Sequence, residues 1–120
     1  MEHFDKAYSK NRDSFLEMPD SIRSKISRRA DDICRLLGVP EKKSKILDLA
    51  CGSGVMAVEL ARRCHDVTGL DCAPSGLQIA AELAQRAGVE VCWIQGDMRG
   101  SFTLDQPQDF VIIWDVVFGV

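Results

Sequence analysis

The spacing of hydrophobic residues changes near residue 45 of this 120-residue chain. Before that point, isoleucine and leucine recur four or seven positions apart through residues 21–37, which is the spacing of one helical face. Gly38 and Pro40 follow the last of them, as is usual where a helix ends. Residues 1–44 are therefore expected to form a helical N-terminal segment.

From Lys45 onward, short apolar runs alternate with helical patterns. The pattern predicts helices over 55–64 and 74–87 and strands over 45–50, 66–71, 89–95 and 109–118. Strands that alternate with helices indicate βαβ units and a parallel sheet covered by helices on both faces. The fold class expected for 45–120 is therefore α/β, with a Rossmann-like parallel sheet.

A glycine-rich segment, "ILDLACGSGVMAVEL", joins the first predicted strand to the helix that follows it. Gly52, Gly54 and Ala57 have the G-x-G-x-x-A spacing that dinucleotide-binding proteins also use. Two glycines at this place are equally typical of a tight turn with no ligand. The glycines alone do not identify the molecule that approaches them.

Three aspartates lie at the ends of three predicted strands, where open α/β sheets bind ligands. Asp48 would repel a pyrophosphate so close to the glycines, and it favours a ligand that carries positive charge. Asp71 is suited to accept hydrogen bonds from two ribose hydroxyls, or else to cap the next helix. Asp97 offers an acceptor for an exocyclic adenine amine at the same edge.

Residues 45–120 resemble the class I S-adenosylmethionine-dependent methyltransferases. Their glycine-rich first motif is similar to "LDLACGSG", their acidic second motif to "VTGLDCAPSGLQIA", their third to "IQGDM" and their fourth strand to "QDFVIIWDVVFGV". The order and spacing of all four segments are more specific than the glycines alone. The resemblance implies strand order 3-2-1-4 here, within a seven-stranded fold of order 3-2-1-4-5-7-6 that this chain covers incompletely.

The resemblance assigns roles to particular residues. It implies that Asp48, Ala50, Gly52 and Gly54 surround the methionine part of S-adenosyl-L-methionine, and that Asp71 holds the ribose. It also implies that Asp97 binds the adenine amine. The residues expected to line the site beside these are Cys51, Cys72 and Met98, the last two against the adenine.

Four aromatic or imidazole side chains have simpler expected places. Trp93 is expected in the core, Tyr8 in the core or on the surface rather than over the cofactor, and His65 on the surface. Trp114 lies at the end of the fourth predicted strand, where methyl donor and acceptor would meet. Asp115, beside it, is equally suited to a catalytic and to a capping role.

Composition narrows the classes of partner. The formal net charge is −3, and the basic clusters at 23–29 and 42–45 are not interleaved with aromatic residues, so nucleic acid is not indicated. Five cysteines without C-x-x-C spacing give no support to a disulfide framework or a metal site, and they fit a reduced cytoplasm. No signal peptide or apolar run of about 20 residues is present.

Three hypotheses remain for the function. The first is methyl transfer to a small-molecule or protein acceptor. The second, supported by the glycine spacing and Asp71, is an oxidoreductase that uses NAD. The third is a non-catalytic cofactor-binding module completed by a partner, since the fourth strand, "FVIIWDVVF", would be an exposed apolar edge through which the chain self-associates.

Overall fold

The computed structural model of the chain describes residues 2–100 and 102–113. Strands and helices alternate in it from residue 45 to residue 95, and in the described residues the last strand follows without a helix before it. The helices are α1 (Glu2–Lys10), α2 (Arg12–Leu16), α3 (Asp20–Leu37), α4 (Val55–Arg62) and α5 (Pro74–Ala87). The strands are β1 (Lys45–Leu49), β2 (Asp66–Asp71), β3 (Cys92–Gln95) and β4 (Phe110–Ile113).

The strands form one parallel sheet in the order β3-β2-β1-β4. This is the order expected from the sequence, and the prediction is confirmed. One register row of the sheet runs across all its strands, through Ile112, Asp48, Gly69 and Trp93. Because the strands are parallel, their carboxyl ends meet at one edge, and Asp48 and Asp71 come near each other there.

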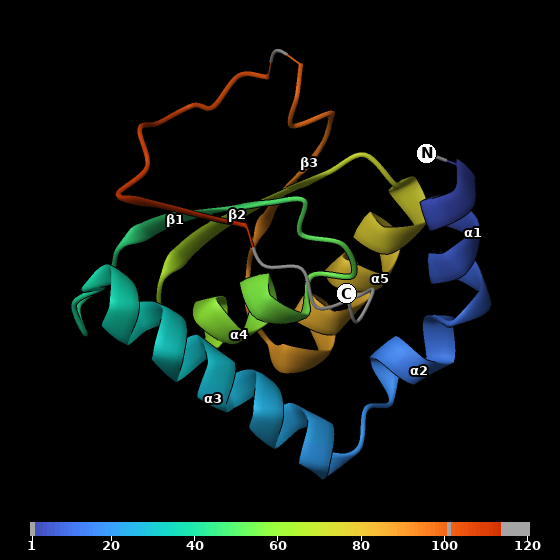
Figure 1. Ribbon diagram of the computed structural model, residues 1–120, viewed down its shortest axis with the longest axis horizontal. Coiled ribbons are helices and arrows are strands. Elements are labelled where there is room, and N and C mark those ends of the chain that lie inside the picture. The colour runs from blue at the N-terminus through green and yellow to red at the C-terminus, as the bar shows by residue number, and fades with distance from the viewer. Residues whose placement is uncertain (1, 101, 114–120) are drawn as a thin grey trace.

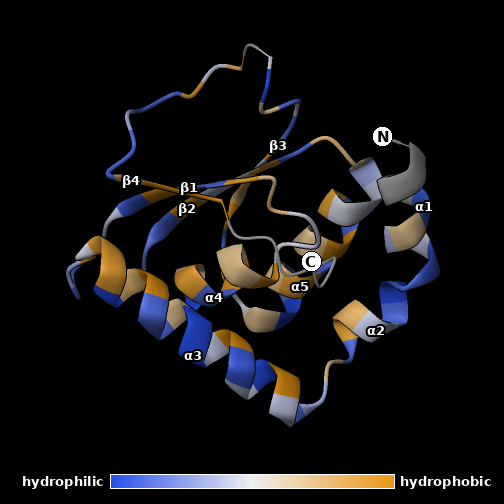
Figure 2. Ribbon diagram, in the orientation of Figure 1, coloured by the Kyte–Doolittle hydropathy of each residue, from blue (hydrophilic) through white to orange (hydrophobic). Residues whose placement is uncertain are grey.

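Helices α3, α4 and α5 lie on the same side of the sheet, while the connection from β3 to β4 loops out away from them (Figure 1). The main hydrophobic core lies between α3, α4 and the strands. Its fully buried members include Ile46 on β1, Leu60 on α4 and Val67 on β2. Hydrophilic residues are frequent along α3, as its blue segments in Figure 2 show, because only one stripe of that helix reaches the core.

Local sequence explains where two of these helices begin and end. Pro74 occupies the first turn of α5, where its missing N–H costs no helical hydrogen bond. Gly88 ends α5 and Gly38 ends α3, each with a φ of 70° that glycine adopts without strain. Both helix ends agree with the sequence prediction.

The N-terminal helices pack against the rest of the chain. Helices α1 and α2 contact α5, and α3 contacts α4. Tyr8 of α1 and Leu16 of α2 are buried in a second small cluster with Ala73 and Ile79. The division of the chain into domains at residues 44 and 45 stays a prediction.

The third strand is shorter than the sequence predicts. The backbone N–H of Val89 donates to the carbonyl of Ala84, 3.0 Å away, so residue 89 belongs to the turn that ends α5. Strand β3 begins only at Cys92, because the helix end uses the residues before it. The fourth strand is described from Phe110 to Ile113, and the rest of its predicted span lies outside the described residues.

The expectation that His65 lies on the surface is wrong. Its side chain is buried, and its Nδ1 accepts a hydrogen bond from the backbone N–H of Ser44 at 3.1 Å. Burial, with a smaller contribution from Arg63, lowers the pKa of this imidazole. His65 therefore connects the residue before β1 to the start of β2 by a hydrogen bond. The sequence alone does not indicate this contact, because Ser44 and His65 are far apart along the chain.

Strand β4 forms the edge of the sheet in the described part of the chain, as expected. Val111 is 53% exposed and Ile113 is 61% exposed, both on the face of the sheet opposite the helices. Apolar side chains on a sheet edge favour association. Among the described residues, no helix is long and apolar enough to cross a bilayer.

Candidate functional site

The turn after β1 has an unusual backbone. Ala50, Gly52 and Gly54 adopt positive φ angles of 56°, 59° and 79°. Such angles favour glycine, and a non-glycine residue that adopts one, like Ala50, is uncommon. Gly54 then serves as the N-cap of α4, so the turn delivers the first N–H groups of that helix to the carboxyl edge of the sheet.

Packing explains why position 54 is glycine. A Cβ there would lie 2.5 Å from the Cβ of Ala80 on α5 and 2.8 Å from the ring of Trp93. Carbon atoms that are not bonded to each other do not approach this closely without a shift of one of them. Gly54 therefore holds α4, α5 and β3 together, and its part in the motif is structural whatever else the turn binds.

Trp93 fills the space beside this turn. A Cβ at Gly69 would lie 2.5 Å from the Trp93 ring and 3.1 Å from the Cys51 sulfur. The indole therefore covers Gly69 on the helical face of the sheet, and Trp93 packs against the main core. Its expected core position agrees with this packing, and the ring helps to keep water from the row that contains Asp48.

Asp71 accepts two backbone hydrogen bonds at the end of β2. The N–H of Gly52 donates to Oδ1 at 3.3 Å, and the N–H of Ala73 donates to Oδ2 at 3.0 Å. The N-cap of α5 is Ala73, so the alternative in which Asp71 merely caps that helix does not describe the structure. A carboxylate has about four acceptor positions, so hydroxyl donors still find acceptors on Asp71.

Asp48 is the most confined acidic side chain near this turn. It is 1% exposed, and its Oδ1 has no hydrogen-bond partner in the described structure. Burial, and then the negative charge of Asp71, raises the pKa of Asp48 to about 8. Its carboxyl group therefore holds a proton at neutral pH, and a positively charged group brought to this place would satisfy it.

Cys51 lies between the two aspartates in the turn. Burial, followed by the charges of Asp48 and Asp71, raises the pKa of its thiol. A cysteine with a raised pKa holds almost no thiolate at neutral pH and is a poor nucleophile. The structure therefore gives Cys51 the properties of a small wall residue.

The end of β3 is different in character. Asp97 is exposed, and the guanidinium of Arg99 donates to both of its carboxylate oxygens at 3.1 Å. These hydrogen bonds, together with one from the Arg99 backbone, lower the pKa of Asp97. Met98 is 41% exposed and Cys72 is half-buried. The candidates for adenine contact are therefore open to solvent, and Asp97 is engaged by Arg99.

The structure adds three residues that sequence reasoning passed over. A Cβ at Gly76 would lie 3.0 Å from the Gly52 carbonyl and 3.0 Å from the Tyr8 ring, so α1, α5 and the turn meet at this glycine. The Oγ of Ser53 is buried without a partner in the described structure. Arg99 is the third. The sequence held a signal for two of them. A glycine inside the predicted helix, two positions after Pro74, indicated a close contact, and the segment "DMR" indicated an ion pair between Asp97 and Arg99.

Two hollows in the described structure lie away from these residues. The one of about 570 Å³ is bounded by α3, α4 and α5, with Ile26, Val58 and Leu83 among its lining residues. The other, of about 630 Å³, lies between α5 and the entry of β3. No group of three metal-ligating side chains occurs in the described residues. Trp114 and Asp115 lie outside the described residues.

The arrangement fits a ligand with a cationic group and a polyhydroxylated part. The buried and uncompensated Asp48 suits an ammonium, and Asp71 suits hydroxyl donors. The Asp71 carboxylate disfavours a pyrophosphate at the turn, and a protonated Asp48 offers it no counter-charge. The residues expected at the site from β1 and β2 thus converge, whereas Asp97 lies in a separate, exposed environment.

Comparison with known proteins agrees with this geometry. The model of a protein family described as a methyltransferase domain matches residues 46–120. The ubiquinone biosynthesis O-methyltransferase of Azorhizobium caulinodans is 36% identical over 78 residues, which cover 65% of this chain and 31% of that protein.

Solved structures show the same fold. The S-adenosylmethionine-dependent methyltransferase of Thiobacillus denitrificans, in complex with S-adenosyl-L-homocysteine, superimposes with a TM-score of 0.60 at 28% identity, over 72% of this chain and 35% of that one. The PH0226 protein of Pyrococcus horikoshii gives a TM-score of 0.66 at 27% identity, over 82% and 43%. This chain therefore spans less than half of the length of each of these relatives. The sheet has the strand order that the resemblance to methyltransferases implied, and the family model matches residues 46–120. The chain therefore belongs to the methyltransferase domain family.

Proposed function

We propose that this chain is the cofactor-binding portion of a methyltransferase that uses S-adenosyl-L-methionine. The observation that carries the proposal is the buried, unpartnered carboxyl group of Asp48 beside Asp71 at a positive-φ glycine turn. A cofactor with an ammonium and a sulfonium supplies the positive charge that this place lacks. When bound, it also supplies an already electrophilic methyl group.

The chain's own residues then bind and orient the cofactor. Asp48 and the turn residues Ala50, Gly52 and Gly54 are assigned to the methionine part, with Cys51 as a wall. Asp71 is assigned to the ribose hydroxyls. Asp97 is assigned to the adenine amine, and the residues flanking the ring are Cys72 and Met98. Because the cofactor is already activated, the protein's main task is to align acceptor and methyl group and to exclude water.

The acceptor is assigned only by class, as a small molecule or a protein. Relatives named for ubiquinone biosynthesis support a small-molecule acceptor. Trp114 and Asp115 are proposed to lie where donor and acceptor meet, with Asp115 as a candidate catalytic group. All five cysteines are unpaired thiols, which supports the cytoplasm as the compartment.

Titration calorimetry with S-adenosyl-L-homocysteine and with NAD tests the proposal directly. We expect S-adenosylhomocysteine to bind and NAD neither to bind nor to compete, because the Asp71 carboxylate would oppose a pyrophosphate and a protonated Asp48 offers it no counter-charge. NAD that displaces S-adenosylhomocysteine at comparable concentration would favour the oxidoreductase hypothesis instead. Absence of binding by either ligand, in a chain that melts cooperatively, would contradict both.

A related proposal is that the chain associates through β4 and transfers no methyl group without further strands. The exposed apolar side chains of Val111 and Ile113 at the sheet edge support it. Sedimentation of the chain should show concentration-dependent association that Val111→Lys reduces. A monomer at high concentration that also methylates an acceptor would refute this proposal and the idea of a module completed by a partner.

A further inference from the structure

Asp48 differs from Asp71 and Asp97 because, within residues 2–100 and 102–113, its Oδ1 has no hydrogen-bond partner and no cation compensates it. Asp71 receives two backbone N–H groups, and Asp97 receives the Arg99 guanidinium. Oδ1 of Asp48 receives no hydrogen bond within the described structure, in a side chain that is 1% exposed. An ionised carboxylate in that position would lack both water and a counter-charge.

The groups that face Asp48 leave little choice about its protonation. On the neighbouring strand, Asp71 raises the pKa of Asp48 and so opposes ionisation of its carboxyl group. The Cys51 thiol is neutral, and the part of β4 that is described, Phe110–Ile113, has no ionisable side chain. The first turn of α4 has no acidic or basic residue either. No described cation acts on Asp48.

A cationic ligand would reverse this balance. An ammonium placed beside the carboxyl group supplies the missing counter-charge and stabilises the ionised form, since an opposite charge within about 4–6 Å favours ionisation. The O–H bond of the carboxyl group then breaks, and its proton passes to the buffer. One carboxylate and one ammonium remain in the site.

We infer that binding of the cofactor's ammonium is coupled to release of one proton from Asp48, which makes Asp48 the residue that selects a cationic ligand. This inference rests on the proposed function, because it needs the cofactor to bind at this turn. It concerns only the chain's own carboxyl group. The affinity of the site therefore depends on pH in a way that an ordinary ionised aspartate would not produce.

Calorimetry in two buffers measures the proton directly. S-adenosyl-L-homocysteine is titrated into the chain at pH 6.5 in phosphate and in bis-Tris, whose ionisation enthalpies differ. At this pH the ligand's α-amino group is already charged, because even a peptide α-amino group has a pKa of about 7.7–8.0 and the ligand's own carboxylate stabilises the ammonium further. We expect about one proton released per ligand bound, and an affinity that rises by up to about tenfold from pH 6 to pH 7.

Two variants locate the source of the proton. Asp48→Asn should release none, whereas Asp66→Asn, an exposed aspartate at the opposite end of the neighbouring strand, should release as much as the parent. If Asp48→Asn binds too weakly for calorimetry, the pH dependence of the parent's Kd decides: a flat profile between pH 6 and 7 overturns the inference.

The remaining outcomes separate this inference from the proposed function. Binding without proton release, or with the same release in Asp48→Asn, would overturn the coupling while the cofactor assignment stands. Absence of binding by the folded parent at every pH would instead refute the proposed function, and the coupling with it.

Discussion

The carboxyl edge of the sheet presents aspartates in two kinds of environment. We call the ends of β1 and β2 the buried end, and the end of β3 the exposed end. At the ends of β1 and β2, Asp48 and Asp71 are buried, and Oδ1 of Asp48 has no hydrogen-bond partner in the part of the chain that the structure describes. At the end of β3, Asp97 is exposed and paired with Arg99. Asp97 follows β3 at the start of the connection to β4, which loops out away from the helices (Figure 1).

The difference indicates which part of the candidate site is preorganised for a charged ligand and which part is not. Burial makes an uncompensated charge unfavourable, so we expect a cationic ligand to be stabilised strongly at the ends of β1 and β2. Exposure lets water and Arg99 satisfy Asp97, so a ligand gains little from displacing them. We therefore expect changes at the buried end to affect stability and affinity far more than changes at the exposed end.

The largest effect should follow substitution of a glycine at the buried end. Gly54→Ala adds a methyl group 2.5 Å from the Cβ of Ala80 at a φ of 79°, so overpacking and backbone strain act together. We expect a loss of roughly 3–5 kcal/mol in the free energy of unfolding. Urea unfolding measures it.

Two other glycines separate the causes. Gly88→Ala shares the positive φ, with no atom within 4 Å of the added Cβ, and should lose about 1 kcal/mol. Gly96→Ala lies at the exposed end with only Leu70 nearby, at 3.9 Å, and should change stability by less than about 1 kcal/mol. Equal losses at positions 54 and 96 would remove the distinction between the two ends.

The second effect is the dependence of stability on pH. Between the ordinary carboxyl pKa of 3.8 and the folded value of about 8, the folded chain keeps a proton on Asp48 that the unfolded chain has released. The folded state binds more protons in this window, so the free energy of unfolding falls as pH rises through it. At about 1.36 kcal/mol per pH unit, we expect the free energy of unfolding to fall by on the order of 3 kcal/mol between about pH 5 and pH 7.

Asp48→Asn is the variant that isolates this contribution. Asparagine cannot ionise, so the variant should gain stability relative to the parent as pH rises from 4 to 8, and match it most closely at low pH. Thermal melts across this range measure the difference. A difference that does not change with pH would mean that Asp48 is ionised in the folded chain. Asp97→Asn provides the exposed comparison, with no comparable rise expected.

The third effect concerns affinity. Asp71→Ala removes an acceptor assigned to the ribose and should weaken binding of S-adenosyl-L-homocysteine by about ten- to hundredfold, or roughly 1.5–3 kcal/mol. Asp97→Ala should weaken it by no more than about fivefold, because water already competes for that carboxylate. Calorimetric titration compares them, with thermal melts to verify folding, since Asp71 also supports the turn through Gly52 and Ala73. A larger loss at Asp97 would reverse the comparison.

Much of the fold follows from local patterns in the sequence. Alternating strands and helices led to the parallel sheet, because βαβ connections allow few alternatives, whereas the strand order was implied by the resemblance to methyltransferases. Helix ends at Gly38 and Gly88 were predictable because a positive φ favours one residue type. Strand β3 was predicted too long because Val89 is compatible with a strand as well as with the turn that ends α5. The hydrogen bond from the Val89 N–H to the Ala84 carbonyl assigns it to the turn.

The aspartates at the strand ends could be named from the sequence, but their environments could not. The same letter, aspartate, stands at positions 48, 71 and 97, and only the packed structure shows one without a partner, one holding a turn and one paired with arginine. These differences come from residues distant in sequence. Trp93 reaches Gly54 and Gly69 across the sheet, and no spacing rule places it there.

The smallest effect should come from the ion pair at the exposed end. Arg99→Gln removes the guanidinium that donates to both oxygens of Asp97, leaving the backbone N–H at 2.9 Å. If Asp97 binds the adenine amine, Arg99 competes with the ligand, so the variant should bind S-adenosyl-L-homocysteine up to about threefold more tightly, without a resolvable change in melting temperature. Added salt should reduce the difference in affinity between the variant and the parent, because it screens the ion pair.

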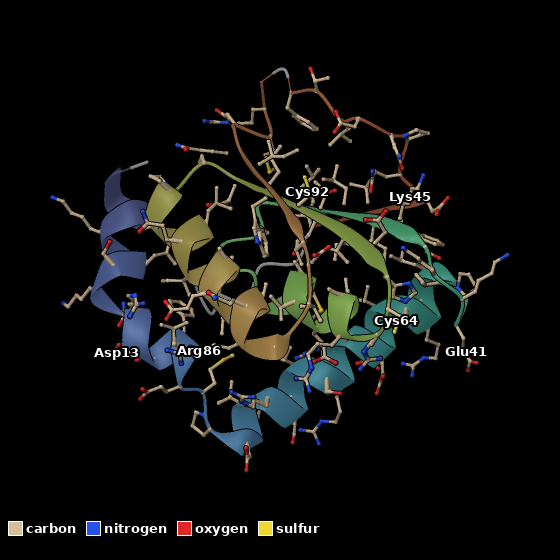
Figure 3. All side chains as sticks on the ribbon, turned by 180° about the vertical axis from the view of Figure 1, so that it is seen from behind. Asp13, Glu41, Lys45, Cys64, Arg86 and Cys92 are labelled. Atoms are coloured by element: carbon tan, nitrogen blue, oxygen red, sulfur yellow. The ribbon has the colours of Figure 1, made fainter. Side chains whose placement is uncertain are left out.

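Arg86→Gln controls for loss of a surface charge and should leave affinity unchanged. Arg86 is an exposed arginine paired with Glu82 on α5, beside α2 (Figure 3). Weaker binding by Arg99→Gln would show that Arg99 contacts the ligand, and the exposed end would then contribute to the site through its cation rather than through Asp97.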